Sequence, residues 1–339
     1  MLSSVRRQVA AVLALLVALT VLTAPLAAAA APSGADGEGG TKSLVQQLDA
    51  ASRGYLDARD ALAGSVRRQH DLAAALVTLD AQVAPRQAQL DRIAQQTYLA
   101  GRLGPISALL TARDSAVLLD RAQTLETLAA QQDGALRDLR TTRTHQQQAK
   151  TEIDATVRDQ QKQLAVMANR KALAEAALKA AGGGQDIGSP GGSRSTLRAT
   201  PVPRNPDGSL PAQGCTVPDP TTSGCITPRM LHAMQQAKAA GFTHCVACFR
   251  HESTGEHPLG RACDFAADVG GFGGVATGAS KDYGNRLANY FIANSDRLGV
   301  LYVIWFERIW LPSSGWKAYT RGNGDPSSDH TNHVHLSVR

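Results

Sequence analysis

Two stretches of the chain contain side chains that can bind a metal ion. The first, HPLGRACD, contains His257 and Asp264; the second, HTNHVHLSVR, begins at His330 and contains His333 and His335. Imidazole and carboxylate groups are preferred ligands of Zn²⁺, and a site with three protein ligands keeps a fourth position open for water. Because such an open site activates water, these residue types indicate a catalytic rather than a structural zinc centre.

Short sequence patterns predict the elements that must position these side chains. The segment HVHLSV is typical of a β-strand. Side chains alternate between the two faces of a strand, so His333 and His335 should point the same way. One of them can then bind the metal while the other moves a proton. Gly260 permits a tight turn between His257 and Asp264, which can bring these two side chains together.

The same stretches resemble a known group of enzymes. HPLGRACD fits HxxGxAxD, the signature of the D-Ala-D-Ala metallopeptidase group, which includes DD-carboxypeptidases, D-Ala-D-Ala dipeptidases and LAS-type murein endopeptidases. ACFRHESTGEH resembles the YR element that precedes this signature, and HTNHVH resembles the HxH that closes LAS-type sites. The motifs lie within residues 245–264 and 330–338, in the order found in that group.

The resemblance implies a role for each matching residue. His257, Asp264 and His335 would bind Zn²⁺. His333 would act as general base or donate a hydrogen bond to the developing oxyanion. Arg250 would bind a substrate carboxylate or stabilise the tetrahedral intermediate through its fixed fork of donors.

Two positions depart from the pattern of that group. Asn332 stands where some members have a catalytic glutamate three residues before the last ligand, and Gly255 stands where a serine is usual. The expected proton acceptor is therefore His333, His330 or Asp329, unless the site is inactive.

Residues 1–31 are typical of a secretory signal peptide. Arg6 and Arg7 precede the apolar run VAAVLALLVALTVL, and an Ala-rich stretch ending near Ala31 suits cleavage. The apolar run is shorter than the roughly 20 residues that span a membrane as a helix. We therefore expect a secreted, extracytoplasmic protein, and the resemblance to murein peptidases implies that it is cell-wall associated.

Export changes the interpretation of the cysteines, because paired cysteines in secreted proteins usually form disulfides. The chain has five cysteines, so at least one has no partner within the chain. We expect the pairs Cys215–Cys225 and Cys248–Cys263, with Cys245 left over. Cys245 and Cys248 form a CxxC motif, but no second CxxC follows, which argues against a zinc ribbon.

Residues 41–182 are predicted to form two long antiparallel helices with a short helical tip. Apolar residues follow the 3-4 spacing of a coiled coil, interrupted only by Arg86. Gly101, Gly104 and Pro105 break the helical pattern between the two halves. The two runs of seam residues are Leu72, Leu76, Leu79, Val83, Leu90 and Ile93, and then Leu118, Leu125, Leu128, Ala135 and Leu139.

This helical region resembles the coiled coils that precede catalytic domains in exported bacterial cell-wall hydrolases. The pairing with the C-terminal motifs is also similar to exported actinobacterial proteins. Such a hairpin can dock a membrane or divisome-type partner, shield an active site, or act as a plain spacer or dimerisation rod.

Residues 183–213 are rich in Gly, Pro and Ser and are interpreted as a flexible linker. Residues 214–339 form the predicted globular domain, in which helices pack beside a small antiparallel sheet, so the fold class is α+β. The net charge is +6, but the basic residues are scattered. No Lys/Arg block with interleaved aromatic residues is present, so we expect no nucleic-acid partner.

Together these patterns predict an exported zinc-dependent peptidase. Its substrate would be peptidoglycan, cleaved in stem peptides or cross-links by metal-activated water. The alternative is a non-catalytic cell-wall-binding or scaffold protein whose metal site is kept for structure.

Overall fold

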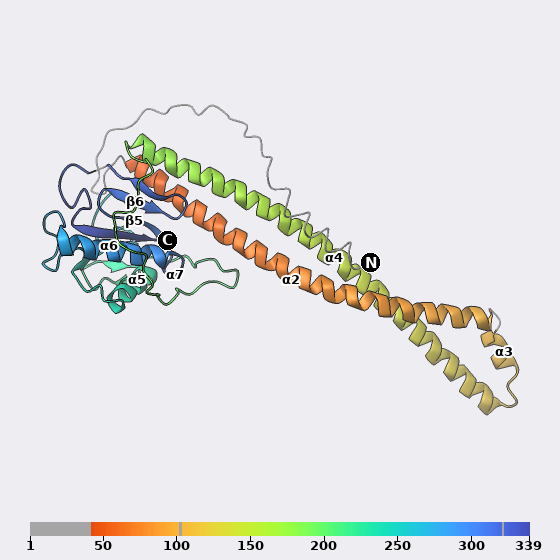
Figure 1. Ribbon diagram of the computed structural model, residues 1–339. Helices are drawn as coiled ribbons and strands as arrows, with labels where there is room; N and C mark the ends of the chain where they lie inside the picture. Colours follow the sequence, from red (N-terminus) through yellow and green to blue (C-terminus); the bar gives the residue numbers. More distant parts are fainter. Residues whose placement is uncertain (1–41, 102–103, 321) are drawn as a thin grey trace. The chain divides into compact units, whose positions relative to one another are not determined.

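The computed structural model describes residues 42–101, 104–320 and 322–339 (Figure 1). The expected signal peptide over residues 1–31 lies outside the described residues. Among the described helices, none combines the length and the apolar character that crossing a membrane requires.

The N-terminal half of the described chain is a helical hairpin. Helix α2 spans Lys42–Ala100, the short α3 spans Gly104–Leu110, and α4 spans Ser115–Ala180. Asp114 caps α4, because its carboxylate accepts a hydrogen bond from the Val117 amide at 2.9 Å. Helices α2 and α4 pack along each other in opposite directions (Figure 1). The predicted hairpin with a helical tip is therefore confirmed.

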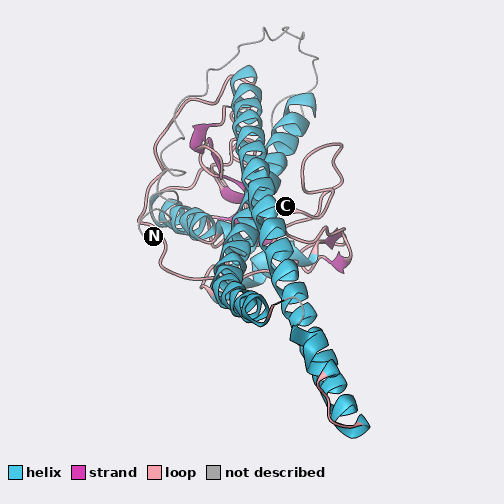
Figure 2. Cartoon of the chain, turned by 90° about the vertical axis from the view of Figure 1, so that its right-hand side faces the viewer, coloured by secondary structure: helices cyan, strands magenta, loops and turns pink. Residues whose placement is uncertain are grey.

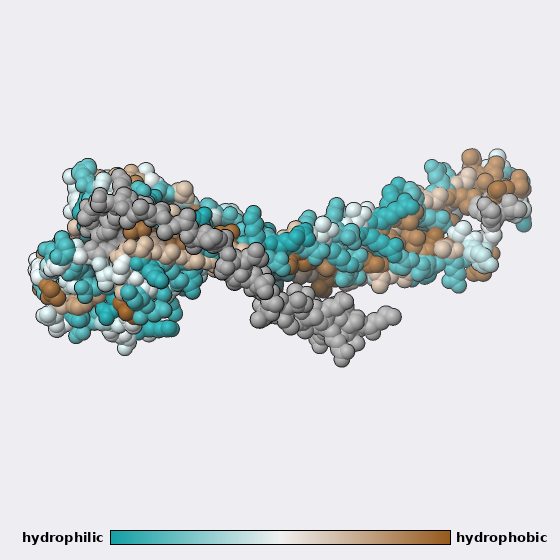
Figure 3. Space-filling model, turned by 90° about the horizontal axis from the view of Figure 1, so that it is seen from above, coloured by the Kyte–Doolittle hydropathy of each residue, from teal (hydrophilic) through white to brown (hydrophobic). Residues whose placement is uncertain are grey.

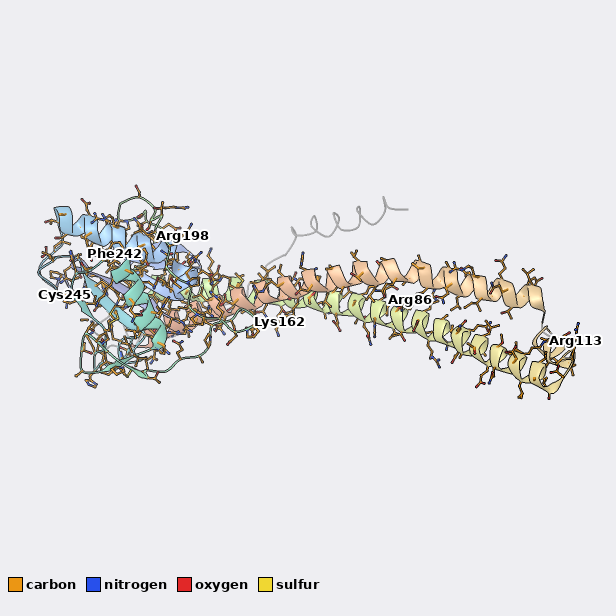
Figure 4. All side chains as sticks on the ribbon, turned by 90° about the horizontal axis from the view of Figure 1, so that it is seen from below. Arg86, Arg113, Lys162, Arg198, Phe242 and Cys245 are labelled. Carbon is orange, nitrogen blue, oxygen red and sulfur yellow. A yellow bond between two sulfur atoms is a disulfide. The ribbon has the colours of Figure 1, made fainter. Side chains whose placement is uncertain are left out.

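The interface between α2 and α4 follows the predicted seam. The seam residues of α2 are half-buried, whereas most of their neighbours are exposed. Arg86, which interrupts the apolar spacing, is also half-buried and points across to α4 (Figure 4). Its guanidinium donates hydrogen bonds to the Asp138 carbonyl at 3.0 Å and to the Thr142 hydroxyl. Arg86, which interrupts the apolar seam, therefore connects the two helices through hydrogen bonds.

Apolar side chains are exposed where the hairpin turns through α3. Figure 3 shows them as a brown region at that end of the helices. Leu118 and Leu128, expected in the seam of α4, are 41% and 44% exposed, so the second seam is looser there than predicted. The most exposed members of the region are Tyr98, Leu99, Ile106, Leu110 and Leu119.

The C-terminal domain is built on a six-stranded antiparallel sheet with the order β3-β4-β8-β5-β6-β7. Figure 2 draws the strands in magenta and the helices in cyan. Helices α5, α6 and α7 and a two-stranded ribbon, β1 with β2, complete it. A helical hairpin followed by this domain confirms the predicted α+β class. The strands are β1 Val217–Pro218, β2 Cys225–Ile226, β3 Val246–Ala247, β4 Ala262–Ala266, β5 Val300–Ile304, β6 Arg308–Leu311, β7 Gly315–Ala318 and β8 His333–Val338, and the helices are α5 Pro228–Ala239, α6 Gly278–Ala293 and α7 Ser295–Leu298.

Two hydrophobic cores lie on the two faces of this sheet. On one face, α5 and α6 pack on residues such as Val303 and Leu336. On the other face, Leu56 of α2 and Leu178 of α4 pack with Leu301 of β5 and its neighbours. The base of the hairpin is therefore a third layer over the sheet, which the sequence analysis did not predict.

The segment 183–213 joins α4 to the domain and contacts it at several points. Ala199 and Val202 are buried, and the Val202 amide donates to the Arg297 carbonyl at 2.8 Å. Arg204 forms ion pairs with Asp60 of α2 at 3.4 Å and with Asp296 of α7 at 2.9 Å. The expected flexibility of this segment stays a prediction. Its contacts connect it both to the hairpin and to the helices of the C-terminal domain.

The shared core predicts that a mutation in the hairpin destabilises the C-terminal domain. Leu56 is 1% exposed, so Leu56→Ala should lower the free energy of unfolding by about 2–5 kcal/mol. All three tryptophans lie in the C-terminal domain, so their fluorescence in a denaturant titration reports unfolding of that domain. Leu119→Ala, at an exposed position of α4, is the matched control and should leave the midpoint unchanged. An unchanged midpoint for Leu56→Ala would show that the hairpin and the domain unfold independently.

Candidate metal centre

The site is organised by the pairing of β4 with β8. Asp264 of β4 lies directly opposite His335 of β8 in the antiparallel register, and Ala266 lies opposite His333. Directly opposed residues point to the same face of a sheet. The register therefore places the Asp264 carboxylate beside the His335 imidazole.

Strand β8 has apolar side chains on one face and two histidines on the other. Val334, Leu336 and Val338 belong to the core under α5 and α6. His333 and His335 point to the opposite face, because side chains alternate along a strand. The expectation that both histidines share a face is therefore confirmed.

His257 reaches the site from the turn before β4. The Gly260 amide closes this turn on the His257 carbonyl at 2.9 Å. Gly260 has φ +64°, and a Cβ atom there would lie 2.4 Å from the Cys215 sulfur. Only glycine fits such a position, because it has no Cβ atom and adopts positive φ without strain. The predicted tight turn is present.

Three ligand atoms of the site lie close together. The His257 Nε2 is 3.2 Å from the His335 Nδ1, and the Asp264 Oδ1 is 2.9 Å from the His335 Nδ1 and 3.4 Å from the His257 Nε2. Bonds of 2.0–2.1 Å in a tetrahedral site place neighbouring ligand atoms about 3.3 Å apart. The three residues form a His/Asp/His cluster that can hold a metal ion, and their separations fit Zn²⁺.

The second nitrogen of each ligand imidazole is engaged in a hydrogen bond. The His257 Nδ1 lies 2.5 Å from the Cys248 carbonyl oxygen, to which it donates. The His335 Nε2 lies 2.8 Å from the Ser337 hydroxyl. With its proton on that nitrogen, each ring presents a lone pair to the cluster, which is how ligand histidines are usually oriented.

Disulfides support the two strands that flank the cluster. Both predicted pairs, Cys215–Cys225 and Cys248–Cys263, are formed, and Cys245 is a free, exposed thiol. The second disulfide joins the residue whose carbonyl holds His257 to the residue that precedes Asp264. It therefore fixes two of the three candidate ligands relative to each other. Two disulfides also fit a protein of an oxidising compartment.

His333 is a third imidazole at the cluster. Its Nε2 lies 3.3 Å from the Asp264 Oδ1, the oxygen that also faces His257 and His335. Its Nδ1 lies 2.7 Å from the Asn332 side-chain oxygen, to which it donates. The Asn332 amide nitrogen donates in turn to the Gly273 carbonyl at 2.8 Å. Asn332 therefore fixes the orientation of His333, a role that the sequence analysis did not assign to it.

Arg250 contacts the cluster through the other carboxylate oxygen. Its guanidinium forms ion pairs with the Asp264 Oδ2 and with Glu252. Burial alone would lower the pKa of Arg250, but these two carboxylates raise it. Burial alone would raise the pKa of Asp264, but the neighbouring imidazoles of His333 and His257 hold it well below its usual value in the metal-free chain. The arginine is thus a support for Asp264, and its expected contact with substrate stays a prediction.

His330 is buried beside the cluster but does not belong to the three ligands. Its ring centroid lies 4.9 Å from that of His333, and its ring meets Tyr319 edge to face. Its backbone has φ +53° and its carbonyl accepts from the Phe306 amide at 2.8 Å. Burial, followed by the charges of His333 and His335, lowers the pKa of His330 well below its ordinary value. His330 therefore packs between the rings of His333 and Tyr319 and is not placed among the candidate ligands.

The hairpin also reaches the site through a residue that sequence analysis missed. Glu256, next to His257, is 1% exposed and forms ion pairs with Arg53 of α2 at 2.6 Å and with Arg261 at 2.5 Å. Arg53 lies some two hundred residues away in sequence, and no local pattern signals this contact. The candidate metal centre is therefore bordered by the base of the hairpin.

The histidine environment predicts that the metal-free protein loses stability in mild acid. Burial lowers the pKa of His335 to about 4, partly offset by Asp264. Below its ordinary pKa of about 6.5 the imidazole gains a proton when the chain unfolds but not in the folded state, so unfolding becomes more favourable as pH falls to about 4.

The expected loss is up to about 3 kcal/mol, measured by denaturant titration with a chelator present. His335→Gln should reduce this dependence, with the part due to the buried His330 remaining, and the exposed His251→Gln should not change it. A wild-type profile that is level between these pH values would contradict the buried neutral imidazole.

A comparison with protein families matches residues 222–334 to the family described as VldE, C-terminal domain. The match covers 113 of the 339 residues and includes His257 and Asp264 but ends just before His335. No curated protein and no solved structure gives a match. The matched segment thus spans β2 to β7 and contains two of the three candidate ligands.

Proposed function

We propose that the protein is an exported zinc-dependent peptidase that cleaves peptidoglycan stem peptides or cross-links. One observation carries the proposal: three buried ligand atoms, 2.9–3.4 Å apart, face one point beside a third imidazole, that of His333. Two imidazoles and one carboxylate are a donor set of catalytic zinc sites. The third imidazole distinguishes the cluster from a purely structural site, which needs no free proton carrier.

His257, Asp264 and His335 are the residues that would hold Zn²⁺. When bound in such a site, Zn²⁺ lowers the pKa of water to about 7 and polarises a carbonyl group. The chain's own contribution is to present three oriented donors and to keep Asp264 ionised. Arg250 serves the last purpose by occupying the outer carboxylate oxygen.

His333 is the proposed proton carrier. Its Nε2 faces the cluster while its Nδ1 donates to Asn332, so Nε2 is the atom that accepts a proton from the attacking water. The same atom can then donate this proton to the leaving amide nitrogen. Some D-Ala-D-Ala metallopeptidases have a glutamate at the position of Asn332. In this scheme Asn332 does not act as the base but orients His333, which does.

The substrate class rests on the resemblance to murein peptidases and on the disulfides. Substrate would approach on the side of Arg250 and Glu252, whose side chains are 35% and 23% exposed, whereas the ligands are almost fully buried. The alternative, a cell-wall-binding protein with a structural metal, is supported by the same burial.

The first test is metal content. The purified full chain should bind one equivalent of Zn²⁺, because three protein donors are already oriented. His257→Ala should reduce the affinity by at least roughly 100-fold, measured by competition with a chromophoric chelator. His251→Ala, which removes an exposed histidine, should change nothing. Absence of zinc binding in the wild-type chain would sink both the peptidase and the structural-metal interpretation.

The second test separates catalysis from a structural metal. His333→Gln should keep one equivalent of zinc but lower kcat/KM on purified muropeptides by about 10²–10⁴-fold, because the general base is lost. Chromatography of the digested muropeptides gives the rate and the bond that is cleaved. A variant with full activity would show that His333 is not the base. A zinc-loaded wild-type chain that cleaves no muropeptide would favour the non-catalytic wall-binding protein.

A further inference from the structure

A cavity of about 460 Å³ lies in the C-terminal domain, between the segment 183–213 and two helices. Residues 193–197 form one wall, residues 240–242 at the end of α5 form a second, and Tyr283 and Arg286 of α6 form the third. None of the proposed zinc ligands lines it, so it is a different site from the candidate metal centre.

The cavity is positively charged. Arg194 and Arg286 face it from two different walls, and no acidic residue lines it. Both side chains are exposed, and among the residues that the structure describes neither forms an ion pair. The guanidinium carbon of Arg286 lies 6.0 Å from the ring centroid of Tyr283. Two guanidinium groups that converge on one cavity without a carboxylate favour an anionic ligand.

Hydroxyl groups and aromatic rings complete the lining. Ser193, Ser195 and Thr196 belong to the first wall. The Ser195 hydroxyl accepts a hydrogen bond from the Leu197 amide at 3.3 Å, which leaves its own hydrogen to donate. Phe242 and Tyr283 meet edge to face, with ring centroids 5.5 Å apart, and supply apolar surface. The lining suits a small anion attached to an organic body.

The first wall is fixed in place by asparagine side chains at the end of α6. The Asn289 side-chain amide donates to the Gly191 carbonyl at 3.0 Å, and that of Asn294 donates to the Leu197 carbonyl at 2.9 Å. The Asn294 side-chain oxygen also accepts from the Ala199 amide at 2.9 Å. Residues 193–197 are thus anchored on both sides, so the wall that carries Arg194 is held against α6.

We propose that this cavity is a binding site for a phosphate group. A phosphate offers several strong acceptor oxygens and about two negative charges, which two guanidinium groups and three hydroxyls can satisfy together. A carboxylate has fewer oxygens and would leave part of these donors unused. This proposal does not depend on the peptidase activity.

Calorimetric titration of the full chain with inorganic phosphate and with glycerol 3-phosphate tests the site. Arg194→Gln and Arg286→Gln should each raise the dissociation constant for both probes by roughly tenfold or more, because each removes a charge-assisted contact. Arg198→Gln is the matched control, because Arg198 is exposed in the same segment but does not line the cavity (Figure 4). It should leave the dissociation constant unchanged.

Two further measurements exclude other origins of the signal. Phosphate also binds zinc, so the titration is repeated on His257→Ala with a chelator present, where binding should persist. Sedimentation with phosphatidylglycerol vesicles, compared with phosphatidylcholine vesicles, tells a lipid headgroup from a soluble phosphate ester as the source. The proposal is overturned if neither probe binds, if Arg198→Gln weakens binding as much as the other two variants, or if binding disappears with the metal.

Discussion

The carboxylate of Asp264 is the group on which the arrangement of the site depends. One of its oxygens faces three imidazoles and the other is paired with Arg250. A buried carboxylate is stable only when its charge is compensated, and here cationic and hydrogen-bonding partners surround it on both sides. These partners come from β8, from the turn before β4 and from the segment after β3. The pairing of β4 with β8 and the disulfide between Cys248 and Cys263 bring those segments together.

The two faces of the sheet pack against different helices: α5 and α6 cover one face, and the base of the hairpin covers the other. The apolar side chains of β8 pack under α5 and α6, so its histidines must occupy the face that the hairpin base also covers. Arg53 of α2 extends this relation to the residue beside His257 through its ion pair with Glu256. The hairpin is therefore part of the structure around the site as well as a separate coiled coil. The Arg53–Glu256 ion pair, at 2.6 Å, places the base of the hairpin one residue away from the candidate ligand His257.

The segment 183–213 also connects the hairpin with the C-terminal domain through side-chain contacts. Its composition is that of a linker, yet Asn289 and Asn294 hold its backbone against α6, and Arg204 connects it to α2 and α7. Glycine and proline keep such a segment free of helix and strand, so its carbonyl and amide groups are open to side-chain partners. This is how a stretch without secondary structure becomes one wall of a basic cavity.

The sequence by itself determined the features that depend on local periodicity or on residue type. The 3-4 spacing of leucines predicted the helical hairpin, the alternation in HVHLSV placed His333 and His335 on one face, and the expectation of export led to the prediction of two disulfides. Tertiary structure alone decided which distant groups meet: Arg250 with Asp264, Asn332 with the Gly273 carbonyl, and the base of the hairpin with the sheet. The physical reason is that strand register and the packing of faces join residues far apart in the chain, and the energy of such contacts leaves no pattern in neighbouring residues.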